Sequence, residues 1–189
     1  MRSVKPGTDA RQTRASVDVW PHMVKLSHLK ALVVDDNAHM RSLLRALLQS
    51  LGIPHIYEAP DGATGFKELC DKKLDIVFTD LSMTPMDGIE FTRKVRKSEE
   101  FPNPFIPIIM VTGHTERERV MMARDAGVTE FLAKPITAQH ILMRLTEIIE
   151  RPRPFVRCDR YFGPDRRRRK DERFKGPWRR RGDGNTEID

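Results

Sequence analysis

The chain has 189 residues, 39% of them hydrophobic and 32% charged, which suffices for one domain with extensions and hardly for two. No stretch approaches the ~18 consecutive apolar residues of a membrane span. Residues 1–27 lack the apolar core of a secretory signal, so we expect a cytoplasmic protein with no membrane insertion. The two cysteines, Cys70 and Cys158, have neither the number nor the spacing of a zinc site or a disulfide framework.

The net positive charge is confined to the C-terminal segment. Residues 151–189 hold 14 Lys and Arg against 7 Asp and Glu, whereas the rest of the chain has 20 of each sign. Such an asymmetry indicates an anionic partner for one segment and not a basic globule.

The first strand and helix follow a flexible N-terminal extension, residues 1–27, which contains Pro6-Gly7 and no sustained period. Residues 31–34 form a short apolar run that ends in two aspartates, as expected of a buried strand. A helix follows, with Asn37 as its predicted N-cap and Gly52 as its stop. Its apolar residues recur at helical spacing: Met40, Leu43, Leu44, Leu47, Leu48 and Leu51.

The same strand-then-helix unit recurs four more times along the chain. Apolar strands joined by helical crossovers predict an α/β fold with a doubly wound, five-stranded parallel sheet covered on both faces. The further predicted strands are 55–58, 76–79, 106–111 and 130–133, and the further helices are 62–72, 88–97, 116–126 and 138–150.

Polar residues stand at the ends of four predicted strands: Asp35 and Asp36, Asp80, Thr112 and Lys134. Ligands of such sheets bind at the carboxyl ends of the strands, so we expect these side chains to meet in one crevice. Three carboxylates there would repel one another unless a hard cation, most simply Mg²⁺, neutralised them. A hydroxyl and an ammonium beside one carboxylate would then cradle a phosphoryl group.

Two other interpretations compete at this point. Asp35-Asp36 by itself would fit a solvated strand-to-helix turn equally well. Phosphatases of the haloacid dehalogenase type also combine a parallel sheet, an aspartate and Mg²⁺, but they need an acid two residues after the nucleophile. That place is Ser82 here, which disfavours the phosphatase.

The order and spacing of these residues resemble the response regulator receiver family, of which CheY is a single-domain member. The matching pieces are Leu32 to Asp36, Asp80 with Met86-Asp87-Gly88, Val111-Thr112-Gly113, and Lys134-Pro135. The resemblance covers residues 30–150 and implies a flavodoxin-like strand order, 2-1-3-4-5. We therefore expect a receiver domain over residues 28–151.

The resemblance also implies roles for individual residues. Asp80 would accept a phosphoryl group from a sensor histidine kinase or a phosphotransfer protein. Asp36 would bind Mg²⁺ directly, Asp35 would bind it through water, and the backbone carbonyl of Ser82 would be a further ligand. The chain would be no enzyme toward a separate substrate, although it would assist its own phosphorylation and dephosphorylation.

Four further residues would sense the phosphoryl group. Thr112 and Lys134 would each contact one of its oxygens. Gly113 would leave room for Thr112 to move, and Phe131 would turn inward as it does so. By strand position alone, Phe131 would be an ordinary core aromatic. The output would be protein contact through the fourth strand, fourth helix and fifth strand, in a phosphorelay that would serve chemotaxis or the flagellar motor.

After Glu150 the sequence changes to a basic tail, residues 152–189. It has few aliphatic residues and interleaves aromatics with arginines, so we expect it to be disordered when free. A Gly-Pro-x-Arg-Arg-Arg pattern occurs twice, and its arginines are the candidate ligand-binding residues of the tail: Arg166, Arg167, Arg168, Arg179, Arg180 and Arg181.

Three roles remain open for this tail. Arginines and aromatics together suit cyclic di-GMP or nucleic acid, because guanidinium groups bind phosphate and aromatic rings stack on bases. The tail could equally dock on an acidic protein surface, or only add solubility. A DNA-binding transcription factor is disfavoured, because no helix-turn-helix follows the receiver.

Overall fold

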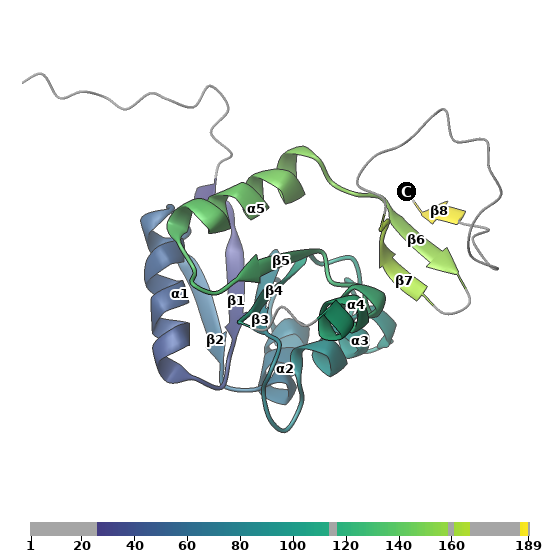
Figure 1. Cartoon of the computed structure of the whole chain (residues 1–189), viewed down its shortest axis with the longest axis horizontal. Coiled ribbons are helices and arrows are strands. Elements are labelled where there is room, and N and C mark those ends of the chain that lie inside the picture. Colours follow the sequence, from purple (N-terminus) through teal and green to yellow (C-terminus); the bar gives the residue numbers. More distant parts are fainter. Residues whose placement is uncertain (1–25, 114–116, 159–160, 167–185, 189) are drawn as a thin grey trace, which may run out of the picture.

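Five parallel strands in the order β2-β1-β3-β4-β5 form the main sheet of the computed structural model, which confirms the predicted doubly wound α/β fold (Figure 1). The structure describes residues 26–113, 117–158, 161–166 and 186–188. The predicted N-terminal extension, 1–27, thus lies mostly outside the described residues, and a 3-10 turn spans Leu26–His28. The strands are β1 (Lys30–Val34), β2 (His55–Ala59), β3 (Ile76–Asp80), β4 (Ile108–Thr112) and β5 (Glu130–Ala133). The helices are α1 (Ala38–Ser50), α2 (Gly62–Asp71), α3 (Gly88–Lys97), α4 (Arg117–Ala126) and α5 (Ala138–Glu150).

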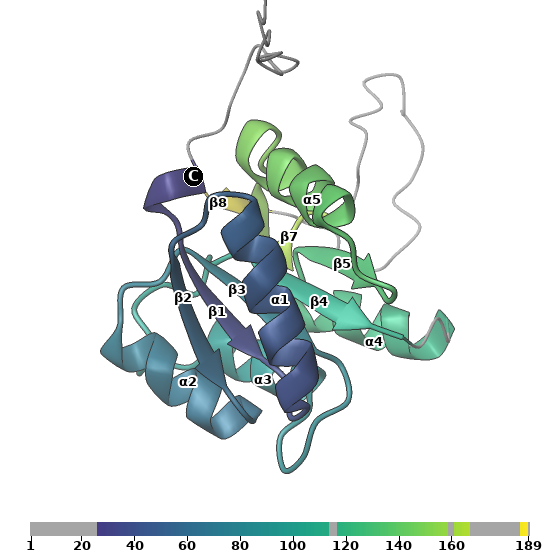
Figure 2. The same cartoon turned by 90° about the vertical axis from the view of Figure 1, so that its left-hand side faces the viewer.

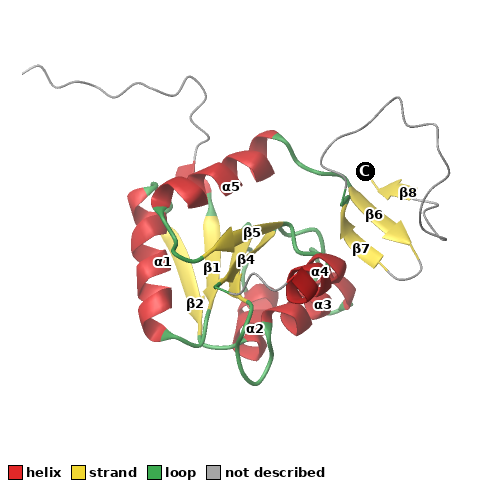
Figure 3. Cartoon of the chain, in the orientation of Figure 1, coloured by secondary structure: helices red, strands yellow, loops and turns green. Residues whose placement is uncertain are grey.

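Helices cover both faces of the sheet (Figures 2 and 3). Alternate residues of β1 point to opposite faces: Ala31 and Val33 pack with α1 and α5, whereas Leu32 and Val34 pack with α2 and α3. The central strands β3 and β4 are buried at every position, which explains their continuous apolar sequence. No helix in the described part of the chain is long and apolar enough to cross a membrane.

Polar side chains fix where the helices begin, which sets the length of each loop at the strand ends. Asn37 caps α1 as predicted, with its side chain accepting bonds from the next helical amides. Asp87 caps α3 in a capping box with Glu90. Thr137 caps α5 just after Lys134.

The tail forms a folded hairpin where the sequence predicted disorder from residue 152. Strand β6 (Phe155–Cys158) pairs antiparallel with β7 (Tyr161–Pro164), and β8 (Thr186–Ile188) pairs with the other edge of β6. At residues 153–158 and 161–166 the structure differs from this prediction, because the segment needs no core of its own. It buries Val156 and Tyr161 where the hairpin packs beside α3 and α4. Residues 167–185 lie outside the described part.

The hairpin covers a buried guanidinium on α3. Arg96 is only 4% exposed and donates hydrogen bonds to the carbonyls of Gly127, Pro104 and Ile106. The ring of Phe155 lies 5.2 Å from the guanidinium carbon. Burial lowers the pKa of Arg96 to about 9, and the three carbonyls supply the hydrogen bonds that a buried cation requires.

Two glycines let the hairpin approach the corner between α4 and β5. Gly127 has φ +101°, and a Cβ there would lie 2.8 Å from the carbonyl oxygen of Phe162. A Cβ on Gly163 would lie 2.8 Å from the Cα of Gly127. The two backbones are thus in direct contact, with no room for a methyl group.

We expect Gly127→Ala to reduce the free energy of unfolding by more than Gly52→Ala does. Both glycines have positive φ, so each substitution costs about 1–2 kcal/mol of backbone strain. Open space surrounds Gly52, whereas Gly127 faces Phe162, so overpacking should add at least about 1 kcal/mol at Gly127. Urea denaturation of the two variants measures the difference, and equal losses would contradict the described hairpin contact.

Candidate functional site

Residues from four strand ends meet at one edge of the sheet. Asp35 directly follows β1, Asp80 ends β3, Thr112 ends β4 and Lys134 directly follows β5. The Nζ of Lys134 lies 2.6 Å from Oδ1 of Asp80 and 3.8 Å from Oδ2 of Asp35. The backbone N–H of Lys134 donates to the carbonyl of Thr112 at 2.9 Å. One ammonium therefore compensates two buried carboxylates.

Both carboxylate oxygens of Asp80 have partners. Oδ1 pairs with Lys134, and Oδ2 accepts a 2.7 Å hydrogen bond from the backbone N–H of Ser82. The loop after Asp80 folds back closely, since the N–H of Gly88 donates to the carbonyl of Leu81. A Cβ on Gly88 would lie 2.2 Å from the carbonyl oxygen of Asp80, so only glycine allows this path. Asp80 is 7% exposed.

Asp35 is the more deeply buried of the site's carboxylates. Its Oδ1 accepts from the N–H of Asn37 at 2.8 Å, and its carbonyl oxygen accepts from Nη1 of Arg41 at 2.7 Å. Its Oδ2 is buried without a hydrogen-bond partner. Burial raises the pKa of Asp35, the hydrogen bond from Asn37 opposes this shift, and the charge of Asp80 adds to it.

These residues supply the hard oxygen donors that Mg²⁺ prefers. The buried, unbonded Oδ2 of Asp35 and the exposed carboxylate of Asp36 lie on the turn beside Asp80. Within the described ranges, no three Asp, Glu, His or Cys side chains form a ready-made metal centre. A cation here would therefore complete its shell with backbone oxygen, such as the Ser82 carbonyl, and with water. With that addition the residues fit the ion.

The two other residues predicted to sense the phosphoryl group lie on β5 and just after β4, beside the strand-end cradle formed by Asp35, Asp80, Thr112 and Lys134. Phe131, on β5, is half-buried and packs against the cluster of Leu81, Ile89 and Met110. Gly113 is exposed, and among the described residues a Cβ there would meet the Lys134 side chain alone, at 3.8 Å, which is ordinary contact. Alanine would therefore fit at position 113 in this arrangement.

Only one of the predicted ligand-binding arginines of the tail, Arg166, lies in the part of the chain that the structure describes. Arg166 forms a 3.2 Å ion pair with Asp125 of α4, and its guanidinium lies 4.0 Å from the ring centre of Tyr161. Its charge is thus engaged by the receiver surface, which weakens its candidacy as a phosphate ligand. The remaining candidates lie outside the described residues: Arg167, Arg168, Arg179, Arg180 and Arg181.

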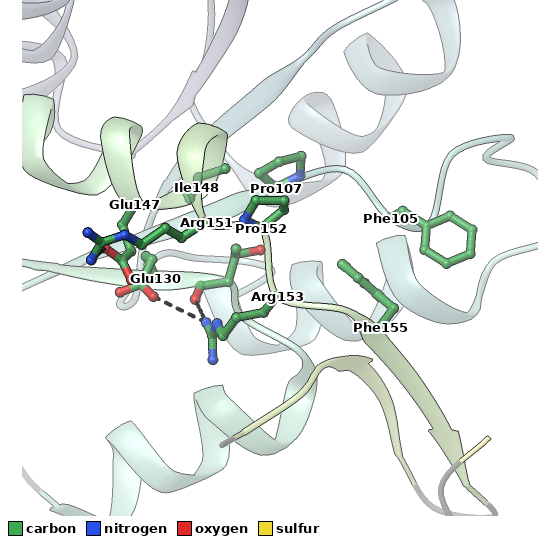
Figure 4. A pocket seen from close by; sticks show the side chains of 10 residues that line it. Phe105, Pro107, Glu130, Glu147, Ile148, Arg151, Pro152, Arg153 and Phe155 are labelled. Atoms are coloured by element: carbon green, nitrogen blue, oxygen red, sulfur yellow. Dashed lines mark hydrogen bonds and ion pairs between the residues drawn. The ribbon is translucent and has the colours of Figure 1, made fainter. Parts of the chain in front are cut away.

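A separate cavity of about 210 Å³ lies at the opposite, amino ends of β4 and β5 (Figure 4). Phe105, Pro107 and Phe155 form apolar walls, and Arg153 and Glu130 pair on its polar side. It shares no residue with the strand-end cradle, so it is no part of the candidate site.

Sequence reasoning missed two groups of residues. Arg41 anchors the Asp35 carbonyl, and its i+4 neighbour on α1, Arg45, pairs with Glu58 of β2. An arginine one turn into a helix after two aspartates is the signal that could have found this contact. The pair between the buried Glu130 and the half-buried Arg153 had no such signal, because Arg153 stands in a proline-rich segment that resembles a linker.

Comparison with known proteins identifies the family. The model of the response regulator receiver domain matches residues 31–146, more than half of the chain. The chain belongs to the response regulator receiver family. The matched range holds β1 through most of α5, and with them Asp35, Asp80, Thr112 and Lys134. It ends before the hairpin, so this receiver carries its hairpin beyond the family's shared domain.

Two curated relatives are chemotaxis proteins. The chain is 36% identical to chemotaxis protein CheY-3 of Vibrio cholerae over 124 residues, which cover 66% of this chain and 94% of the relative. It is 37% identical to chemotaxis protein CheY of Pseudomonas aeruginosa over 123 residues, covering 65% and 98%.

Solved receiver structures share the fold. Vibrio cholerae CheY4 aligns with a TM-score of 0.58 and 29% identity, covering 64% of this chain and 98% of its own. The receiver domain of the histidine kinase CKI1 from Arabidopsis thaliana, complexed with Mg²⁺ and BeF₃⁻, aligns with a TM-score of 0.57 and 29% identity, covering 65% and 91%. Receiver domains thus bind Mg²⁺ as a family property.

We expect Asp35→Asn to raise the free energy of unfolding at pH 7 in metal-free buffer. Burial raises the pKa of Asp35 above its unfolded value, so ionising this group costs folded-state stability. That cost is present above the folded pKa and disappears as the pH falls below the unfolded pKa. The asparagine retains the oxygen that accepts from Asn37.

Urea denaturation at pH 7 and at pH 3.5 tests this expectation. The gain should shrink at the lower pH, where Asp35 is largely protonated in both states. Asp36→Asn, on an exposed side chain, is the matched control and should change little. An Asp35→Asn variant with a lower free energy of unfolding than the unaltered chain at pH 7 would refute the argument.

Proposed function

We propose that the chain is a response regulator of a two-component phosphorelay, phosphorylated on Asp80 by a sensor histidine kinase or a phosphotransfer protein. The observation that carries the proposal is the position of Asp80 between the Lys134 ammonium and the Ser82 N–H, at the open end of the sheet. These donors are aimed at the oxygens where charge changes during the transfer.

In the proposed reaction, a carboxylate oxygen of Asp80 attacks the phosphorus of a phosphohistidine. A P–O bond forms, the P–N bond breaks, and the imidazole leaves with the bond's electron pair. Lys134 and the Thr112 hydroxyl bind phosphoryl oxygens, and Phe131 and Gly113 respond to that change. Asp35, Asp36, Asp80 and the Ser82 carbonyl would hold Mg²⁺, which would supply positive charge that offsets the phosphoryl oxygens.

On this proposal the protein is a switch and no enzyme toward a separate substrate. Its named relatives are chemotaxis proteins, which supports an output by protein contact in chemotaxis or at the flagellar motor. The alternative, an effector that binds cyclic di-GMP or nucleic acid through its tail, has less support. Arg166, the one candidate tail arginine with described contacts, is paired with Asp125.

Asp80→Asn should abolish phosphorylation. Incubation with acetyl phosphate and Mg²⁺ should label the unaltered chain on one aspartate, detectable as a single phosphoryl mass increment. The asparagine keeps the side-chain shape but is a far poorer nucleophile. Asp71→Asn, an exposed carboxylate on α2, should be labelled normally. Undiminished label in Asp80→Asn would refute the assignment.

Asp36→Ala should abolish stabilisation by Mg²⁺. An ion that binds only the folded state stabilises it by about 2.7 kcal/mol at a concentration 100 times its Kd. Thermal melts with a Mg²⁺ series should therefore shift upward for the unaltered chain and for Asp71→Ala, and stay flat for Asp36→Ala. A Mg²⁺-dependent shift that survives in Asp36→Ala would contradict the proposed ligand set.

A further inference from the structure

The hairpin and the phosphoryl cradle are attached to opposite ends of the same strand. Glu130, the first residue of β5, is almost fully buried, and its Oε1 lies 3.2 Å from Nη2 of Arg153 (Figure 4). Arg153 also donates to the carbonyls of Thr129 and Asp165, the latter at 3.0 Å. Lys134 directly follows the last residue of β5. The four residues of β5 therefore connect the two sites.

The hairpin also holds the C-terminal end of α4. Arg166 pairs with Asp125 in the last turn of that helix. Next to it, the backbones of Gly127 and Gly163 meet so closely that neither position has room for a Cβ. Contacts of this kind have little tolerance, because close-packed backbones lose their attraction within a fraction of an ångström. The hairpin therefore favours one position of α4 relative to β5.

Phosphorylation of Asp80 would add negative charge beside Lys134, at the far end of β5. Both oxygens of Asp80 already have partners, Lys134 at 2.6 Å and the Ser82 N–H at 2.7 Å. A phosphoryl group bonded to Oδ1 lies within reach of the Lys134 ammonium, and one bonded to Oδ2 lies beside the Ser82 N–H. The phosphoryl oxygens then attract the Lys134 ammonium to a new position. The backbone N–H of Lys134 donates to the carbonyl of Thr112, so a shift of Lys134 also affects β4.

We propose that the β6–β7 hairpin is an autoinhibitory clamp that stabilises the unmodified receiver and loosens when Asp80 carries a phosphoryl group. The inference rests on the proposed function. It follows from linkage: contacts formed with the unmodified arrangement of α4 and β5 oppose any ligand that shifts them, and that ligand weakens the contacts by the same factor.

The test measures affinity for beryllofluoride, a phosphoryl mimic, in the presence of Mg²⁺. Gly163→Ala and Arg166→Ala disturb the clamp from the hairpin side and leave every residue of the receiver unchanged. Both should bind the mimic at least about five-fold more tightly than the unaltered chain, the low end of typical allosteric couplings. Arg157→Ala is the matched control, because this exposed arginine lies over the ring of Phe162 within the hairpin itself.

Hydrogen exchange supplies the reciprocal measurement. In the unaltered chain, the mimic should accelerate hydrogen exchange of the amides of residues 161–163. The Gly163→Ala substitution should do the same in the absence of the mimic. Equal mimic affinity in all the variants, although exchange shows the hairpin released in Gly163→Ala, would overturn the clamp and leave the proposed function intact. If the unaltered chain binds no mimic and accepts no phosphoryl label, the proposed function fails and the clamp fails with it.

Discussion

The ammonium of Lys134 is the only cation that the described structure places between Asp80 and Asp35. Two carboxylates this deeply buried would repel one another and lose their hydration, so the site depends on this compensation. The parallel sheet makes it possible, since Lys134 follows β5, Asp80 ends β3 and Asp35 follows β1. Lys134 compensates the charge of Asp35 only in part, because Oδ2 of Asp35 has no hydrogen-bond donor and burial raises the pKa of this carboxyl group.

The hairpin and the residues next to it compensate buried charges at the opposite end of the sheet. Glu130 is buried at the start of an edge strand, with ion pairs to Arg153 of the tail and Arg144 of α5. Arg96 is buried nearby and bonded to carbonyls, with Phe155 covering it. Residues beyond the shared receiver domain thus complete the burial of charged groups that the receiver itself carries. The tail is part of the fold over residues 153–158 and 161–166, and its sequence continues as a basic segment.

Most of the fold was predictable because it depends on local patterns. Apolar runs gave the strands, helical spacing gave the helices, and Asn37 marked the start of α1. The crevice residues were also predictable, since the sheet rule brings strand ends together whatever the loops do. The hairpin was not, because its stability comes from contacts with residues far away in the sequence, such as Gly127, and its own composition resembles a linker.

The sequence alone determined the element order, the doubly wound sheet and the set of residues at the strand ends, because periodicity and strand-end chemistry are properties of short segments. Tertiary structure decided which charges face one another. It paired Arg166 with Asp125, where the sequence suggested a phosphate ligand, and Arg153 with Glu130, where it suggested a disordered tail. The physical reason is that an ion pair depends on distance in space, which short-range sequence patterns do not encode.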